Sequence, residues 1–468
     1  MNPMETNTPT QKITKSLRNL VWILVLGGFT PALDSTVVNV AIPTIGRELH
    51  TTVATSQWTI TGYLLAMAIV IPASAWLLER LGGKKLWLLA LVFFLAGSIL
   101  SGAAWSIESM VVFRIIQGAA AGILTPLVVT LIIRQAKGIP LGSLMAVATL
   151  PIVIVPVFGP VIAGLIVGHF SWRWIFYVNV PITFLAVALA WWKLPKDEPP
   201  GEKHQFDLLG FVQLAPALAL IFYGLSNATG VNGFDSKSVY IPLVIGLVLA
   251  VCFTVYALRK KNPLIDVRAL RVRAFATSLG ILFLSGLSVY GPLLLISLFY
   301  QEVQHRSTLM TGILLAPQGA GSLLPRVFTG KLVDRIGPRP VILGGLAITV
   351  LGTLPFAFAT ANTSEWLLGF ALFVRGVGLT PVNIAVMVGA YEGVPKEELP
   401  NASSTTRIIQ QVGGSFGTAV LIVILTRAAL THTLHSQAFN VAFWWSIGFV
   451  ALAVVPTLLL PKLRKQPV

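Results

Sequence analysis

Residues 19–43 read NLVWILVLGGFTPALDSTVVNVAIP, an apolar run with one charged side chain, Asp34. A run of about 20 apolar residues is long enough to cross the hydrocarbon core of a bilayer as a helix. The basic residues just before it, including Lys15 and Arg18, resemble the start of a signal peptide. The run is too long for a cleavable segment and lacks a small-residue cleavage site, so we interpret it as a first membrane span.

Apolar runs of this length recur to the end of the chain. Only 11% of the 468 residues are charged and 55% are hydrophobic, whereas a soluble domain carries about 25% charged residues. The pattern predicts about 14 spans, which must be helices because lipid offers no hydrogen-bond partners to the backbone. They run roughly over 19–43, 55–78, 85–104, 108–133, 142–167, 174–194, 208–227, 239–258, 274–299, 308–330, 340–360, 366–390, 403–426 and 440–461.

The basic residues explain the net charge of +16 without a nucleic-acid partner. Most Lys and Arg residues fall in the tails and in alternate loops, a bias that marks the cytoplasmic side. We therefore expect a multi-pass protein of the cytoplasmic membrane with both termini in the cytoplasm. The densest cluster, between residues 259 and 273, is interpreted as a topology anchor against anionic lipid headgroups. The single cysteine, Cys252, excludes an intrachain disulfide.

An internal repeat appears at an offset of about 255 residues. Leu78–Gly82 matches Val333–Gly337, and Thr125-Pro126 matches Thr380-Pro381. Parallel repeats of six helices are typical of rocker-type transporters, whose substrate site lies between the halves. The predicted division is a cytoplasmic tail (1–18), a six-helix bundle (19–194), an inserted two-helix segment with flanking cytoplasmic loops (195–273), a second six-helix bundle (274–461) and a cytoplasmic tail (462–468).

Five stretches carry a family resemblance. They read LDSTVVNVAIP (33–43), AWLLERLGGKK (75–85), RIIQG (114–118), PVFGPVIAG (156–164) and GKLVDRIGPR (330–339). Together they resemble motifs of the major facilitator superfamily, in particular its 14-span drug:proton antiporter branch. The resemblance implies an all-α polytopic membrane protein with the major facilitator fold, two six-helix bundles plus two inserted helices.

The match to these motifs is partial. In the first loop motif Ala75 stands for the usual Gly, Leu78 for Ala and Glu79 for Asp, whereas the second copy keeps Gly330 and Asp334. In the fifth span Val155 and Ala163 stand where the antiporter motif has Gly. The motifs therefore indicate the superfamily and its branch but not the substrate.

Asp34 is the one carboxylate placed deep inside a predicted span. A charge at mid-helix costs about 2.5–3.5 kcal/mol on insertion scales, so such a residue is a functional candidate. Removal from water favours the neutral form, which would allow the carboxyl to carry a proton. The alternative is a structural acid paired with an intramembrane arginine.

Arg114 shares a helix face with Gln117, Gly118 and other small residues that permit close helix contact. The resemblance implies that Arg114 tunes proton transfer at the acid. A guanidinium does not lose its proton, so Arg114 would be a fixed charge rather than the carrier. The alternative is a purely structural hydrogen-bonding role.

A second group of candidates would control the change of conformation. The resemblance implies a hinge and a seal against leak in the fifth span, and ordinary helix packing is the alternative. The loop motifs would latch the outward-facing state through their carboxylates, and a topology anchor is the alternative. The candidates are Pro156, Gly159, Pro160 and Gly164 in the fifth span, Glu79, Arg80, Gly82, Lys84 and Lys85 in the first loop motif, and Asp334, Arg335 and Gly337 in the second.

A third group would line a cargo cavity. Its members are Asn39, Gln57, Tyr63, Gln117, Tyr290, Gln318, Arg375, Gln410 and Gln411. An apolar cavity with one acid suits lipophilic and often cationic drugs, but four intramembrane arginines against one acid suit an organic anion equally well. Arg326 and Arg407 lie near inner ends of spans, from where they can reach the lipid interface.

No phosphate loop, metal-binding spacing or nucleophile elbow occurs in the sequence, so we expect neither an enzyme nor a cofactor. The predicted function is a proton-coupled antiporter that exports drugs or other small amphipathic compounds by alternating access. The alternative is an exporter of the same fold for a metabolite such as an organic anion, peptide or siderophore. The expected partners are the small-molecule substrate, protons and the bilayer; an envelope adaptor is an open question.

Overall fold

The computed structural model describes residues 15–51, 53–56, 58–135, 144–145, 148, 150–195, 205–228, 233–392, 394–395, 398–431 and 435–460. These residues form helices and connecting loops without a strand. The predicted tails, apart from 15–18, lie outside the described residues. The all-α class is confirmed.

The helices follow the predicted spans closely. The first half contains α1 (Lys15–Glu48), α2 (Val53–Ser56), α3 (Trp58–Val70), α4 (Ala73–Leu81), α5 (Gly83–Gly102), α6 (Ile107–Gln135), α8 (Leu150–His169), α9 (Trp174–Tyr177) and α10 (Asn179–Lys193). The inserted pair is α11 (Leu208–Asn227) and α12 (Lys237–Arg259). The second half contains α13 (Arg273–Leu298), α14 (Thr308–Leu323), α15 (Arg326–Ile336), α16 (Pro338–Thr353), α17 (Glu365–Tyr391), α18 (Leu399–Thr431), α19 (His435–Leu452) and α20 (Val454–Leu459).

Within the described residues, 11 helical stretches are long and apolar enough to cross a membrane, and the bent pair α3–α4 makes a twelfth. This pair bends by 59° where Pro72 precedes α4, because proline cannot continue the backbone hydrogen bonding of α3. The two other predicted spans coincide with α8 and with α14 followed by α15. The chain is a multi-pass helical membrane protein.

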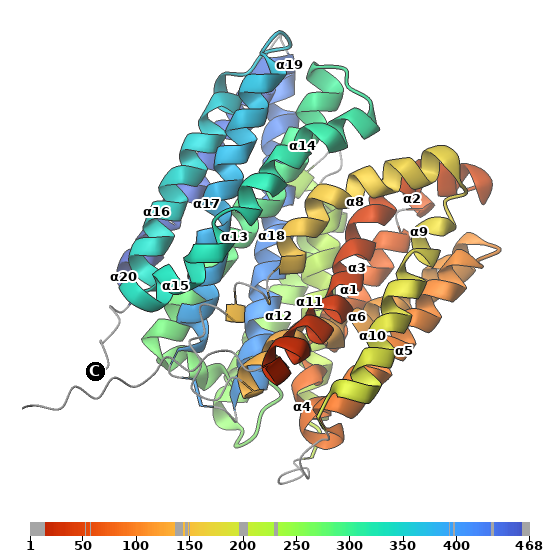
Figure 1. Ribbon diagram of the computed structural model, residues 1–468, viewed down its shortest axis with the longest axis vertical. Coiled ribbons are helices and arrows are strands. Elements are labelled where there is room, and N and C mark those ends of the chain that lie inside the picture. Colours follow the sequence, from red (N-terminus) through yellow and green to blue (C-terminus); the bar gives the residue numbers. More distant parts are fainter. Residues whose placement is uncertain are drawn as a thin grey trace, which may run out of the picture.

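The first half (α1–α10) and the second half (α13–α20) lie side by side, as Figure 1 shows. They meet where α8 packs on α14, α6 on α18 and α4 on α18. The inserted helix α11 packs against α12, α3 and α18 and so contacts both halves. We call the face on which α1 begins and α20 ends the terminal face.

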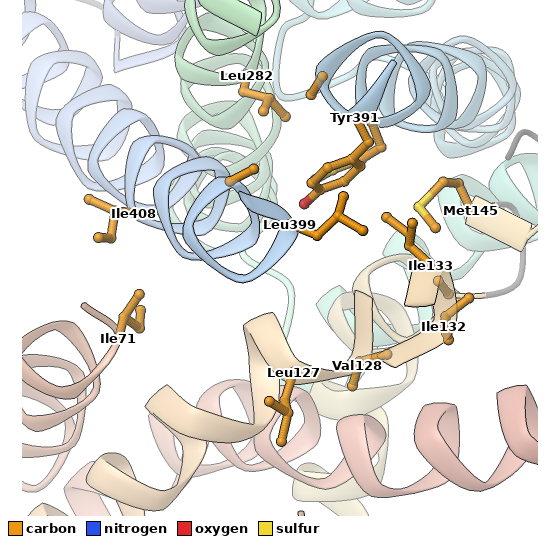
Figure 2. Packing of buried hydrophobic residues seen from close by; sticks show 14 of the residues in the cluster. Ile71, Leu127, Val128, Ile132, Ile133, Met145, Leu282, Tyr391, Leu399 and Ile408 are labelled. Atoms are coloured by element: carbon orange, nitrogen blue, oxygen red, sulfur yellow. The ribbon is translucent and has the colours of Figure 1, made fainter. Parts of the chain in front are cut away.

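Apolar side chains from both halves meet in one buried cluster towards the terminal face. Figure 2 shows part of it, with Leu127 and Val128 from α6 and with Tyr391, Leu399 and Ile408 from the second half. Because these side chains are excluded from water, the cluster holds the two halves together in this conformation.

The repeat reappears as two identical turns. Gly82 separates α4 from α5 with φ 84° and ψ 163°, and Gly337 separates α15 from α16 with φ 88° and ψ 164°. This backbone region is essentially restricted to glycine, because a Cβ would clash with the backbone. The glycine of each loop motif is therefore required by the turn itself.

Gly337→Ala is expected to lower the free energy of unfolding by about 1–3 kcal/mol, because alanine has to adopt this strained conformation. Gly344→Ala is the matched control on α16, since a Cβ there meets nothing within 4 Å. Thermal unfolding of the purified protein in detergent should show a lower midpoint for the first variant only. Equal midpoints would contradict the requirement for glycine at the turn.

Asp207 joins the two inserted helices at their ends. Its carboxylate accepts hydrogen bonds from Gly210 N at 3.0 Å, Tyr256 Oη at 2.7 Å, Lys260 Nζ at 2.8 Å and Leu264 N at 2.9 Å. Burial alone would raise the pKa of the carboxyl, but these donors, Lys260 first, hold the pKa below its ordinary value. The ionised form therefore stabilises this corner of the fold.

Asp207→Asn is expected to destabilise the protein by about 1–3 kcal/mol at neutral pH, because buried donors lose their acceptor. Since the pKa of the folded state is depressed, the stabilisation is present above the ordinary pKa and is lost as the pH falls below about 4. Unfolding midpoints measured against pH should fall more steeply for the wild type than for the variant in this acidic range. Parallel curves would contradict the assignment.

Candidate functional site

An ion pair between Asp34 and Arg114 lies at the centre of the first half. Asp34 is on α1 and Arg114 on α6, and their side chains are 0–1% exposed. Nη1 of Arg114 donates to Oδ2 of Asp34. A buried pair of this kind persists only if further hydrogen bonds satisfy the remaining lone pairs and N–H groups.

Amide side chains supply these further bonds to the acid. Oδ1 of Asp34 accepts from Nε2 of Gln117 at 3.0 Å and from Nδ2 of Asn179 at 3.1 Å. Nδ2 of Asn179 also lies 3.3 Å from the hydroxyl of Ser98 on α5. Helices α1, α5, α6 and α10 therefore all contribute to the hydrogen-bonded network around one carboxylate.

The guanidinium is enclosed as fully as the acid. Nε of Arg114 donates to the carbonyl of Thr59 at 3.0 Å, and Nη1 donates to Oε1 of Gln117 at 2.7 Å. The ring of Tyr63 lies 4.2 Å from the guanidinium carbon, and its hydroxyl donates to the carbonyl of Pro31 at 3.2 Å. An aromatic face over a desolvated guanidinium adds a favourable cation–π interaction.

The small residues beside Arg114 allow α3 to approach this closely. A Cβ on Gly118 would lie 2.2 Å from the carbonyl oxygen of Tyr63, and one on Gly122 would lie 2.5 Å from that of Met67. On α5, a Cβ on Gly97 would lie 2.9 Å from Gln117. Glycine at these positions therefore lets the backbones of α3 and α5 pack closely against α6, the helix that bears Arg114.

A second buried arginine lies in the second half, but it does not align with Arg114 under the offset of about 255 residues. Arg375 on α17 is fully buried, and it donates to Oε1 of Gln318 at 2.5 Å and to the carbonyl of Ser288 at 2.9 Å. Under the offset of about 255 residues, Gln318 aligns with Tyr63, and Ser288 aligns with Leu33, the residue before Asp34. Within the described residues Arg375 forms no ion pair, so this second centre has no acid.

A cavity of about 70 Å³ lies between the halves. Its lining comes from α1, α6, α17 and α18, together with Ala148. It includes Arg407 and Gln410, and Gln410 is one of the predicted cargo residues. Tyr63, Gln117, Gln318 and Arg375 belong instead to the two arginine centres. The polar lining residues are Thr125, Tyr391, Ser403, Thr406, Arg407 and Gln410.

Several predicted residues lie elsewhere. Tyr290 packs against the second half's α18, where a Cβ on Gly414 would lie 2.7 Å from its ring, and Gln411 is half-buried on α18. Gln57 and the side chains of Asn39, Pro156 and Pro160 lie outside the described part of the structure.

The glycines of α8 make close contacts on both sides of the helix. A Cβ on Gly159 would lie 2.6 Å from Oγ1 of Thr36, two residues from Asp34. A Cβ on Gly164 would lie 3.3 Å from Leu309 of α14, in the other half. Helix α8 thus lies between the acid-bearing helix and the second half.

The loop motifs lie on the terminal face. Nζ of Lys84 donates to the carbonyls of Trp191 and Leu194 at 2.8 and 2.9 Å, where a cation compensates the carboxyl end of α10. The guanidinium of Arg80 lies over the Trp76 ring at 5.3 Å. The remaining members, Glu79, Lys85, Asp334 and Arg335, are exposed or half-buried around the two glycine turns.

The sequence prediction missed the polar residues that complete the network. Asn179 and Ser98 are fully buried and contact the acid directly or through one another. A polar side chain within an apolar span was the available signal, but helix spacing does not reveal which spans are neighbours. Within the described residues no three His, Cys, Asp or Glu side chains come together as metal ligands.

Two helical bundles that carry a sequence repeat, with a cavity between them, are typical of membrane transporters. The family model described as Major Facilitator Superfamily matches residues 24–418, and the chain belongs to that superfamily.

The relatives and solved structures agree with this assignment. The chain is 34% identical to the "Multidrug resistance protein B homolog" of Mycobacterium tuberculosis over 86% of its length and 75% of that protein. It is 27% identical to the "Multidrug export protein EmrB" of Escherichia coli over 89% and 82% of the two chains. The fold is similar to the proton:xylose symporter XylE, with a TM-score of 0.63 and 15% identity over 95% and 96% of the chains.

Arg114→Met is expected to destabilise the protein by about 3–5 kcal/mol, because it leaves the Asp34 carboxylate buried without its counter-ion. The double variant Asp34→Asn/Arg114→Met should recover most of this loss, since neither charge then remains. Arg427→Met is the control, because Arg427 pairs with Asp235 on the surface and exposed pairs contribute about 0–1 kcal/mol. Unfolding midpoints measure all three, and a double variant no more stable than Arg114→Met would argue against a coupled pair.

Proposed function

We propose that this protein is a proton-coupled antiporter that exports drugs or other small amphipathic compounds across the cytoplasmic membrane by alternating access. The observation that carries the proposal is the buried Asp34 carboxylate, held by Arg114 beside a cavity between the halves. The names of the relatives, which are multidrug resistance and multidrug export proteins, support a drug-like cargo.

Protonation of Asp34 would change the forces at the centre of the first half. The neutral carboxyl loses its Coulomb attraction to Arg114, and its OH becomes a donor where Gln117 and Asn179 also donate. The pair is therefore stable with the proton absent and is weakened when the proton binds. This is the property that a proton carrier requires, because the two protonation states favour different helix arrangements.

The acid and the cavity share their helices. Ala32 and Gly28 of α1 line the cavity, and Ala32 is two residues from Asp34. Thr125 and Val128 of α6 line it as well, on the helix that bears Arg114. A movement of α1 against α6 on protonation would change the cavity wall directly, so proton and cargo would each influence the binding of the other.

The size of the cavity implies motion of the halves. Drug-sized ligands occupy pockets of about 300–1,000 Å³, whereas this cavity measures about 70 Å³. The apolar cluster that contains Tyr391 and Leu399 joins the two halves, and α8 packs on α14 between them. Admission of a drug-sized cargo therefore requires the halves to separate at one of these contacts.

The terminal face is proposed to be cytoplasmic, because it carries the basic loop motifs and the cluster that follows α12. Cargo would then enter from the cytoplasm, and a proton would enter from outside. The proton gradient would supply the energy without a cofactor, at about 2.3 kcal/mol per charge for each 100 mV of potential.

Asp34→Asn is expected to abolish dye efflux driven by an imposed pH gradient in proteoliposomes, because asparagine cannot exchange a proton. Dye exchange without a gradient should persist, since the amide still accepts from Gln117 and Asn179. Asp235→Asn is the control, because this carboxylate is 77% exposed at the surface. Gradient-driven efflux that survives in Asp34→Asn at the wild-type rate would refute the assignment.

A further inference from the structure

Arg407 is a cation in the cavity wall that forms no ion pair with any residue that the structure describes. It lies on α18, is half-buried and lines the cavity. Among the described residues its one direct partner is Oε1 of Gln410, to which Nη1 donates at 3.3 Å, and its buried Nε has no partner there. A half-buried guanidinium with so few hydrogen bonds can form charge-assisted hydrogen bonds to an acidic ligand.

No carboxylate of the described chain is available to neutralise this charge. The cavity lining contains no Asp or Glu among the described residues. Asp34 is already paired with Arg114, and Glu392, adjacent in sequence to the cavity residue Tyr391, forms no ion pair with Arg407. Burial raises the pKa of Glu392, which favours its neutral form.

The rest of the wall indicates the shape of the ligand. Tyr391 and Thr406, whose hydroxyls hydrogen-bond to each other at 2.8 Å, line the cavity together with Arg407. The other lining residues, apart from Thr125, Ser403 and Gln410, are apolar or small. These are Gly28, Ala32, Pro126, Val128, Val129, Ala148 and Met387. A molecule with one acidic group and an apolar body matches both sets of lining residues, because the acid supplies a counter-ion to Arg407 and the body is buried against the apolar residues.

We infer that the cargo of this cavity is an amphipathic organic anion whose acidic group is held by Arg407. The inference rests on the proposed export function and specifies its substrate class. A fixed guanidinium also disfavours cations, so the same residue provides discrimination against cationic drugs. Export of one anion and import of one proton are each equivalent to the movement of one positive charge inward. A membrane potential that is negative inside would therefore drive export, in addition to the pH gradient.

Three matched probes test the charge preference: 1-naphthylacetate, its methyl ester and 1-naphthylmethylammonium. Binding to the full-length protein in detergent is measured by equilibrium dialysis. Wild-type protein should bind the carboxylate more tightly than the ester and the ester more tightly than the ammonium. Arg407→Gln should weaken carboxylate binding about tenfold or more, the effect of losing a charge-assisted hydrogen bond, and should change ester binding less than about twofold.

Two further variants control the experiment. Arg407→Lys keeps the charge and should retain much of the carboxylate affinity. Arg427→Gln makes the same substitution at the far end of α18, where the arginine is 66% exposed, and should change nothing. Retained ester binding in Arg407→Gln shows that the cavity is intact.

Two results would overturn the inference: equal loss of carboxylate and ester binding in Arg407→Gln, or wild-type preference for the ammonium probe. Transport by wild-type proteoliposomes distinguishes failure of the anion site from failure of the proposed export function. Proton-driven export of the ammonium probe with exclusion of the carboxylate would leave the export function standing and refute the anion site. Carboxylate binding that depends on Arg407 without proton-driven transport would support the site and refute the antiporter.

Discussion

The structure depends on keeping the Asp34–Arg114 pair away from water while supplying hydrogen bonds to both charged groups. Lipid provides no hydrogen bonds, so the protein itself has to supply them, and it does so with Gln117, Asn179 and the carbonyl of Thr59. This requirement brings α1, α3, α6 and α10 to one point. The same requirement explains Gly118 and Gly122 of α6, because larger side chains there would keep the backbone of α3 away from the helix that bears Arg114.

The two halves share a plan but differ in charge. The first half pairs its buried arginine with an acid, whereas the second half surrounds Arg375 with an amide and a backbone carbonyl. The cavity between them carries Arg407, a further cation of the second half. In the proposed mechanism the two halves have different roles. The first half exchanges a proton, and the second half provides a positive charge that binds the cargo.

The helices could be predicted because span length and apolar composition are local properties. Gly82 and Gly337 were predicted only as members of the loop motifs, and their positive φ comes from the structure. Asp34 and Arg114 were each predicted as functional residues, but their pairing was only an alternative interpretation. Asn179 was missed, since its role depends on α10 lying beside α1. Arg407 was interpreted as a residue that reaches the lipid interface, because a cavity formed between halves leaves no trace in the periodicity of one helix.

The central claim is that the Asp34 carboxyl alternates between an ionised state paired with Arg114 and a neutral, protonated state. Infrared difference spectroscopy of the reconstituted protein during a pH titration tests it most directly. The account predicts a protonated-carboxyl C=O band that appears on acidification, within the pH range where gradient-driven efflux changes, and that is absent from Asp34→Asn. An identical band in the variant, or a wild-type carboxylate that stays ionised throughout that range, would contradict it.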